Sequence, residues 1–138
     1  GPPGALITGI LVVNNLRDIP TDRAAGKRTL AVVLGKRATQ AEFGALLGIS
    51  HAVPVLLVAA WIAGWSPAGG DAPLVPFVLL PLLTLPMASP LLRAVRTFRE
   101  PRELNLVLKG TARLSLVFSL LFALGLALAG ASLGGSAG

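Results

Sequence analysis

Long apolar runs alternate with short polar stretches along this chain. Three long stretches carry no Lys, Arg, Asp or Glu, although the first includes a histidine, His51. About 20 apolar residues are enough for a helix to cross the hydrocarbon core of a bilayer. The pattern therefore predicts three complete transmembrane helices, roughly at residues 41–65, 73–93 and 108–131. A fourth apolar segment, residues 1–15, is predicted to be the end of a further transmembrane helix.

Composition supports the membrane interpretation. Hydrophobic residues make up 54% of the 138 residues and charged residues 13%, whereas soluble domains carry about 25% charged residues. A buried soluble core is the alternative, but four such segments leave no amphipathic shell to cover them. We therefore expect an all-α polytopic transmembrane helix bundle, with residues 1–138 forming a single membrane domain.

The N-terminal residues do not resemble a signal peptide, because they lack a basic region and a plausible cleavage site. They look like the interior of an apolar segment, and there is no initiator Met, so we expect the chain to be a fragment. The absence of Cys excludes disulfides and thiolate metal sites.

The basic residues indicate an orientation. All twelve Lys and Arg fall within residues 17–37 and 93–113, and neither the turn around Asp71 nor the C-terminal tail has any. The positive-inside rule then places both basic clusters in the cytoplasm, with the Asp71 turn and the C-terminus outside. Nucleic-acid binding explains the net charge poorly, because these basic loops are short and lie against the membrane.

The first polar stretch, residues 16–38, is predicted to be a cytoplasmic loop rich in aspartate. Asn14, Asp18 and Asp22 are spaced so that they would share one face of a continuous helix. Pro20 is expected to disturb that helix near residues 16–19, which would place Asp18 at a helix C-terminus and Asp22 just beyond it. Because a helix C-terminus carries partial negative charge, two carboxylates there require a cation.

Two sources of positive charge are available. The side chains of Arg17, Arg23, Lys27 and Arg28 would make the segment a salt-bridged loop. Alternatively, Mg²⁺ is usually held by one or two carboxylates together with substrate phosphates, and the same cationic side chains would then bind the remaining phosphate oxygens. The second interpretation is favoured, because it explains the presence of both signs of charge.

These residues carry a resemblance to a known family. The stretch "NNLRDIPTDRAAGKRTLAVVLGKRAT" resembles the second aspartate-rich motif of the UbiA superfamily of intramembrane prenyltransferases. Within that superfamily its pattern is most similar to 1,4-dihydroxy-2-naphthoate polyprenyltransferases of menaquinone biosynthesis. The C-terminal stretch "LNLVLKGTARLSLVFSLLFALGLAL" resembles the last segment of the same enzymes with less specificity.

The resemblance implies a fold of nine transmembrane helices around a cavity, capped by two aspartate-rich motifs that bind a prenyl diphosphate through Mg²⁺. This chain would supply the C-terminal part. The first motif is absent from it, since its other acidic residues lack the required spacing; these are Glu42, Asp71, Glu100 and Glu103. We therefore expect the isolated 138 residues to be inactive.

The implied reaction is Mg²⁺-dependent transfer of a polyprenyl group from polyprenyl diphosphate to 1,4-dihydroxy-2-naphthoate, with loss of the carboxyl group of the acceptor. The implied location is a bacterial inner membrane. Asp18 and Asp22 match the metal-binding catalytic carboxylates, and Asn14 matches the leading polar position, for which Asn15 is a substitute. The diphosphate or the cap would be held by the nearby cations, with Lys27 and Arg17 preferred over Arg23 and Arg28.

Other polar residues receive more ordinary interpretations. Lys109 and Arg113 can reach the diphosphate or the acceptor, although membrane anchoring is the favoured role for both. His51 is expected to form a hydrogen bond between helices, because a metal site needs more ligands. Trp61 and Trp65 are interpreted as interfacial anchors. A set of regularly spaced arginines is expected to meet anionic lipid: Arg93, Arg96, Arg99 and Arg102.

Three alternatives remain open at this stage. The chain could belong to a related prenyltransferase with another acceptor, such as 4-hydroxybenzoate, homogentisate or a tetrapyrrole. It could instead be a small non-enzymatic membrane protein, which the missing first motif would favour. A phospholipid-alcohol phosphotransferase also keeps aspartates four residues apart, but its D-G-x-x-A-R element is not found.

Overall fold

The computed structural model describes residues 1–64 and 75–134, and these residues form helices and connecting turns without a strand. This confirms the predicted all-α class. The elements in chain order are α1 (Pro2–Ala24), α2 (Leu30–Ile62), α3 (Val75–Val78), the 3₁₀ helix η1 (Leu80–Thr84), α4 (Leu85–Thr97), the 3₁₀ helix η2 (Pro101–Glu103) and α5 (Leu104–Gly134). The predicted turn at Asp71 and the predicted anchor Trp65 lie outside the described residues.

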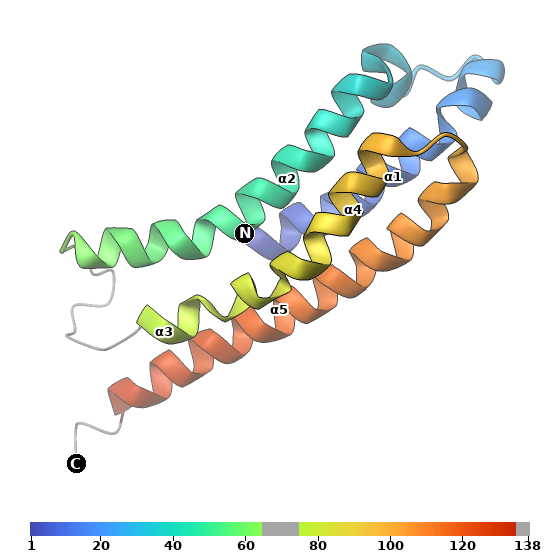
Figure 1. The fold of residues 1–138 in the computed structure, drawn as a ribbon. Helices are drawn as coiled ribbons and strands as arrows, with labels where there is room; N and C mark the ends of the chain where they lie inside the picture. The colour runs from blue at the N-terminus through green and yellow to red at the C-terminus, as the bar shows by residue number, and fades with distance from the viewer. Residues whose placement is uncertain (65–74, 135–138) are drawn as a thin grey trace.

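The helices run roughly alongside one another, as Figure 1 shows. Helix α1 packs against both α2 and α5, and the broken series α3–η1–α4 packs along α5. The chain direction alternates, so that the α1–α2 and α4–α5 connections lie at the same end of the bundle. Two polar stretches that are far apart in the sequence are thereby brought close together.

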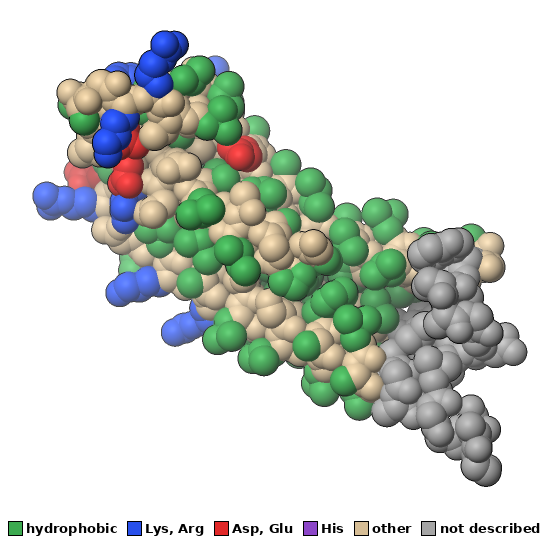
Figure 2. Space-filling view, turned by 180° about the vertical axis from the view of Figure 1, so that it is seen from behind, with side chains coloured by type: hydrophobic (Ala, Val, Ile, Leu, Met, Phe, Trp, Pro, Cys, Tyr) green, Lys and Arg blue, Asp and Glu red, His purple; other side chains and the backbone are tan. Residues whose placement is uncertain are grey.

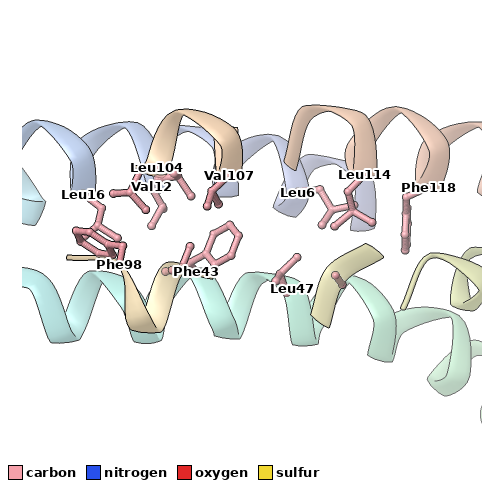
Figure 3. Packing of buried hydrophobic residues seen from close by; sticks show 13 residues of the cluster. Leu6, Val12, Leu16, Phe43, Leu47, Phe98, Leu104, Val107, Leu114 and Phe118 are labelled. Carbon is pink, nitrogen blue, oxygen red and sulfur yellow. The ribbon is translucent and has the colours of Figure 1, made fainter. Parts of the chain in front are cut away.

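A continuous apolar core joins the helices, as Figure 3 shows. Phe43 of α2 and Phe118 of α5 are fully buried in it. The Phe43 ring lies close to Gly9 of α1. A Cβ atom added to Gly9 would be 3.5 Å from the Cε2 atom of Phe43. The remaining fully buried members come from α1, α4 and α5, and include Leu6, Val13, Val95, Leu104 and Leu114. This packing fixes the position of α1 relative to α5.

Two helical stretches among the described residues are long and apolar enough to cross a membrane, Leu30–Ile62 and Pro101–Leu128. The structure differs from the single helix predicted over residues 73–93. In the part of this range that the structure describes, α3, η1 and the first part of α4 take its place. Pro81 and Pro86 each stand in the first turn of a new helix. Proline has no N–H to continue a preceding helix but fits the first turn of the next one, and this explains the breaks.

The interruption expected at Pro20 is wrong, because α1 continues through it to Ala24. Proline removes one backbone hydrogen bond, but Leu16 is buried in the core one turn earlier and holds the helix in place. The Thr21 Oγ1 hydroxyl adds one local hydrogen bond, which it donates to the carbonyl of Asp18 at 2.9 Å. Consequently Asp18 and Asp22 both lie on the helix and not beyond its end.

The segment predicted as a loop, residues 16–38, is mostly helical, with a short turn between α1 and α2. The turn is built on Gly26, whose φ of +71° suits glycine. The amide of Gly26 donates to the carbonyl of Arg23, and the amide of Lys27 donates to that of Asp22 at 2.9 Å. This is a Schellman motif, and it ends α1 directly after the acidic pair.

Helix α2 starts at a defined cap and is not straight. The Thr29 side chain accepts a hydrogen bond from the amide of Val32 at 3.3 Å, which is the usual role of an N-cap threonine. Gly35 has non-helical backbone angles, with φ of +81°, and separates the first turn from the rest of the helix. The later change of direction in Figure 1 lies in the half of α2 that contains Pro54.

Candidate functional site

Charged side chains gather at one end of the molecule in Figure 2. Contacts show that both basic stretches meet there: Lys36 donates through Nζ to the carbonyl of Phe98 at 3.2 Å and lies 3.9 Å from the centre of its ring. Gln40 donates to the carbonyl of Val95 at 2.7 Å. These contacts attach the start of α2 to the end of α4 and make the polar end a single surface.

Three of the predicted site residues share a face of α1 at this end. Asn14, Asp18 and Asp22 are each half-buried, and because the helix is continuous their spacing brings them into line. The side chain of Asp18 is 38% exposed and that of Asp22 is 14% exposed. The two carboxylates therefore lie one helical turn apart on the same face of α1, at the polar end.

Asp18 is held by its neighbour in the sequence. The Nε and Nη2 atoms of Arg17 donate to Oδ1 and Oδ2 of Asp18, at 2.8 and 3.2 Å. This two-point pairing matches the fork of a guanidinium to the plane of a carboxylate. The hydrogen bonding that Arg17 donates to Asp18 raises the pKa of Arg17, an effect that burial opposes and that the charge of Asp18 reinforces.

The third nitrogen of Arg17 reaches a different helix. Its Nη1 atom donates to Oδ1 of Asn105 at 3.1 Å, and Asn105 is an exposed residue in the first turn of α5. Sequence reasoning missed Asn105, because its role depends on a contact between segments 88 residues apart. The available signal was its spacing of four residues from Lys109, which places the two side chains on one face of α5.

Asp22 has a looser cationic neighbour. The Nζ atom of Lys27 lies 3.6 Å from Oδ1 of Asp22, and the side chain of Lys27 is 67% exposed. Such an exposed pair contributes little to stability, so the ammonium group is free to exchange its carboxylate for another anion. The turn at Gly26 is what returns Lys27 toward the carboxylate of the preceding helix.

The other predicted cations do not join an ion pair among the residues that the structure describes. Arg23 and Arg28 are exposed on either side of the turn, and Asn15 is exposed beside Asn14. Lys109 and Arg113 are exposed on α5. Among the described residues, Arg17 and Lys27 are the two cations that pair with these carboxylates.

The donor set suits a metal that is shared with a substrate. Nowhere in residues 1–64 and 75–134 do three or more His, Cys, Asp or Glu residues form a group able to hold a metal ion. Two carboxylates with nearby cations do fit Mg²⁺ bound to a diphosphate, because Mg²⁺ keeps few protein ligands and takes phosphate oxygens and waters for the rest.

His51 forms the predicted hydrogen bond between helices. Its Nδ1 atom is 2.8 Å from the carbonyl of Leu47, and its Nε2 atom is 3.0 Å from Oγ1 of Thr84 in η1. The ring also meets Phe118 edge to face, with centroids 5.3 Å apart. The buried imidazole therefore ties α2 to the broken helix and packs on α5.

A cavity of about 260 Å³ opens between α2 and α4. Its lining is mainly apolar and consists of Gly44, Leu47, Gly48, His51, Leu85, Ala88, Ser89 and Leu92. None of the acidic or basic side chains predicted for the site takes part in it. The polar end and this apolar cavity are distinct features of the fold.

Residues 2–107 match the UbiA prenyltransferase family, and the chain therefore belongs to that family. The matching range contains the acidic pair, the turn at Gly26 and Asn105. No solved structure gives a significant match.

Several curated proteins are similar to this chain over most of its length. The 1,4-dihydroxy-2-naphthoate octaprenyltransferase of Mycobacterium tuberculosis is 37% identical over 117 residues, which cover 85% of this chain and 35% of the relative. The enzyme of the same description from Haemophilus influenzae is 31% identical, over 89% of this chain and 36% of its own. The UbiA prenyltransferase domain-containing protein 1 of Danio rerio is 34% identical, over 92% and 33%. The chain thus spans about a third of the length of these relatives.

Proposed function

We propose that this chain carries the second aspartate-rich motif of a Mg²⁺-dependent prenyltransferase that uses 1,4-dihydroxy-2-naphthoate. The observation that carries the proposal is the pair Asp18 and Asp22, aligned one turn apart on α1 at the polar end, each beside a cation. Family membership and the printed activity of the relatives from Mycobacterium tuberculosis and Haemophilus influenzae support the choice of reaction.

In the proposed reaction the allylic C–O bond of a polyprenyl diphosphate breaks and diphosphate leaves with the electron pair. A carbon of the electron-rich acceptor ring forms the new C–C bond, and that carbon loses its carboxyl group as CO₂. Bound Mg²⁺ would supply charge stabilisation for the leaving diphosphate. Positive side chains placed where negative charge develops stabilise the transition state in the same way.

The chain's own residues have distinct parts in this proposal. Asp18 and Asp22 would hold the metal, and Asn14 would add a polar contact one turn earlier on the same face. Arg17 and Lys27 would pass from the carboxylates to the diphosphate, with Arg23, Arg28 and Lys109 around them. The apolar helices would keep water away from the reactive allylic carbon.

The proposed setting is the inner membrane of a bacterium, with several spans and with the polar end in the cytoplasm. Two apolar helices of sufficient length support a membrane location. The concentration of Lys and Arg at one end supports the orientation through the positive-inside rule. In this arrangement the prenyl tail lies in lipid and its diphosphate lies at the polar end.

The test uses membranes that contain the gene product carrying these residues. We expect polyprenyl diphosphate, Mg²⁺ and 1,4-dihydroxy-2-naphthoate to give a decarboxylated prenyl-naphthoquinol, and EDTA to abolish its formation. Asp18→Asn and Asp22→Asn should each remove this turnover, because each replaces a charged ligand with a neutral one. Glu42→Gln, an equal change of charge outside the motif, is the control and should retain turnover. Full activity of both aspartate variants would refute the proposal.

A second acceptor class is tested in the same assay. Because the chain matches the UbiA family as a whole and not one enzyme alone, other aromatic acceptors are included in the assay. Product from 4-hydroxybenzoate or homogentisate alone would keep the diphosphate chemistry but change the acceptor. Absence of product from every acceptor would favour a non-enzymatic membrane protein instead.

A further inference from the structure

Each of the three nitrogens of the Arg17 guanidinium forms a hydrogen bond, and these bonds reach two helices. Two of its nitrogens contact the carboxylate of Asp18, and Nη1 contacts Oδ1 of Asn105 at 3.1 Å. Asn105 belongs to α5, so the amide side chain links the start of that helix to the acidic motif on α1. No role for Asn105 follows from the acidic motif itself.

The observed pairing conflicts with the binding of a metal by Asp18. Both carboxylate oxygens of Asp18 face Arg17 at hydrogen-bonding distance. Each of these oxygens keeps a second lone pair, but a metal ion bound through both of them competes with the guanidinium for the carboxylate charge and favours its release. Arg17 then needs another anionic partner, and the diphosphate offers oxygens that suit the same planar fork.

The contact with Asn105 can survive this exchange, because it uses the one nitrogen that does not touch Asp18. An arginine side chain released from its only partner would regain rotamer freedom, and ordering it again on the ligand has an entropic cost. An amide oxygen that stays bonded to Nη1 reduces that cost. Being neutral, it does so without adding a negative charge that would repel the diphosphate.

We propose, on the basis of the function proposed above, that Asn105 is a positioning residue. It holds Arg17 at the motif while the guanidinium passes from Asp18 to the diphosphate of the metal complex. Asn105 itself touches neither metal nor diphosphate and acts through Arg17. Lys109, four residues further along the same face of α5, contributes its own charge independently of this link.

The experiment measures binding separately from turnover. The gene product carrying these residues is purified in detergent, and the Kd of inorganic diphosphate in the presence of Mg²⁺ is determined by calorimetry. We expect Asn105→Leu to weaken this binding about fivefold, because the ligand would then have to order an Arg17 side chain that is no longer held by the amide. The exposed neighbour Leu106 is 74% exposed, and Leu106→Ala is the matched control with unchanged binding.

A double-mutant cycle with Arg17→Ala distinguishes positioning from a general structural effect. In the Arg17→Ala background, Asn105→Leu should change the Kd by less than about twofold, because contacting residues are coupled and the coupling vanishes with the partner. In turnover, Asn105→Leu should raise the KM of the prenyl diphosphate by a similar factor. The kcat and the KM of the aromatic acceptor should be unaffected.

Each outcome has a definite meaning. An unchanged Kd in Asn105→Leu, or an equal loss with and without Arg17, would overturn the role of Asn105 while leaving the proposed function intact. If the unsubstituted protein binds no Mg²⁺–diphosphate and transfers no prenyl group, the proposed function fails and the role of Asn105 fails with it.

Discussion

The buried hydrogen bond between His51 and Thr84 allows a quantitative prediction for Thr84→Val. His51 is 7% exposed and Thr84 is 1% exposed. A backbone carbonyl only accepts, so the Nδ1 atom of His51 carries the proton donated to Leu47, and Nε2 is left as an acceptor for the Thr84 hydroxyl at 3.0 Å. Valine has nearly the shape of threonine but no hydroxyl, and it would leave Nε2 without a donor.

The expected size of the effect follows from this environment. An unsatisfied polar group in a soluble core costs about 1–3 kcal/mol, whereas hydrogen bonds between membrane helices average about 0.6 and reach about 1.7 kcal/mol. We therefore expect Thr84→Val to lower the free energy of unfolding by about 1 kcal/mol, or about fivefold in the folding equilibrium. The Thr84 hydroxyl has a single proton, and it is shared between Nε2 of His51 and the carbonyl of Pro81, which accepts from the same Oγ1 atom at 2.7 Å. Part of the loss therefore does not involve His51.

The assay is reversible unfolding in mixed micelles with increasing sodium dodecyl sulfate, followed by helical circular dichroism. Measuring Thr84→Val in the natural sequence and in a His51→Leu background separates the two hydrogen bonds. The loss in the free energy of unfolding caused by Thr84→Val should be larger, by most of about 1 kcal/mol, when His51 is present. Identical losses in the two backgrounds would refute the reasoning, because the histidine would then contribute nothing through Thr84.

Three glycines give further predictions. A Cβ at Gly125 would overlap the backbone carbonyl of Phe77, which cannot turn away as a side chain could, so Gly125→Ala should destabilise by about 1–3 kcal/mol. Gly48 has open space around its Cβ position, and Gly48→Ala should instead gain up to about 1 kcal/mol; equal effects of the two changes would contradict this. Gly26→Ala should cost about 1–2 kcal/mol at its positive φ and speed hydrogen exchange of the Lys27 amide. Unchanged exchange there would show that the turn does not depend on glycine.

Local patterns predicted those features that depend on local physical chemistry. The uncharged runs gave the helical class, and the spacing of Asn14, Asp18 and Asp22 gave their shared face. The isolated His51 was correctly expected to bond to another helix. In each case the deciding quantity, either helical periodicity or the cost of an unpaired polar group, can be read along a single segment.

The errors arose where tertiary packing outweighed a local preference. Pro20 was expected to end α1, but the burial of Leu16 and the hydrogen bond from Thr21 keep the helix intact. The helix predicted over residues 73–93 failed for a different, local reason: proline cannot continue a preceding helix, and Pro81 and Pro86 each stand in the first turn of a new one. Asn105 was missed because its partner lies on another helix.

The alternating direction of the helices has a consequence for the electric field at the polar end. Helices α1 and α4 end there, while α2 and α5 begin there. Each helix terminus carries about half an elementary charge, negative at the C-terminus and positive at the N-terminus. At a distance the four backbone contributions therefore largely cancel, and the field that an approaching anion meets there is set mainly by the side chains. Single substitutions that leave every helix unchanged are thus sufficient to retune it.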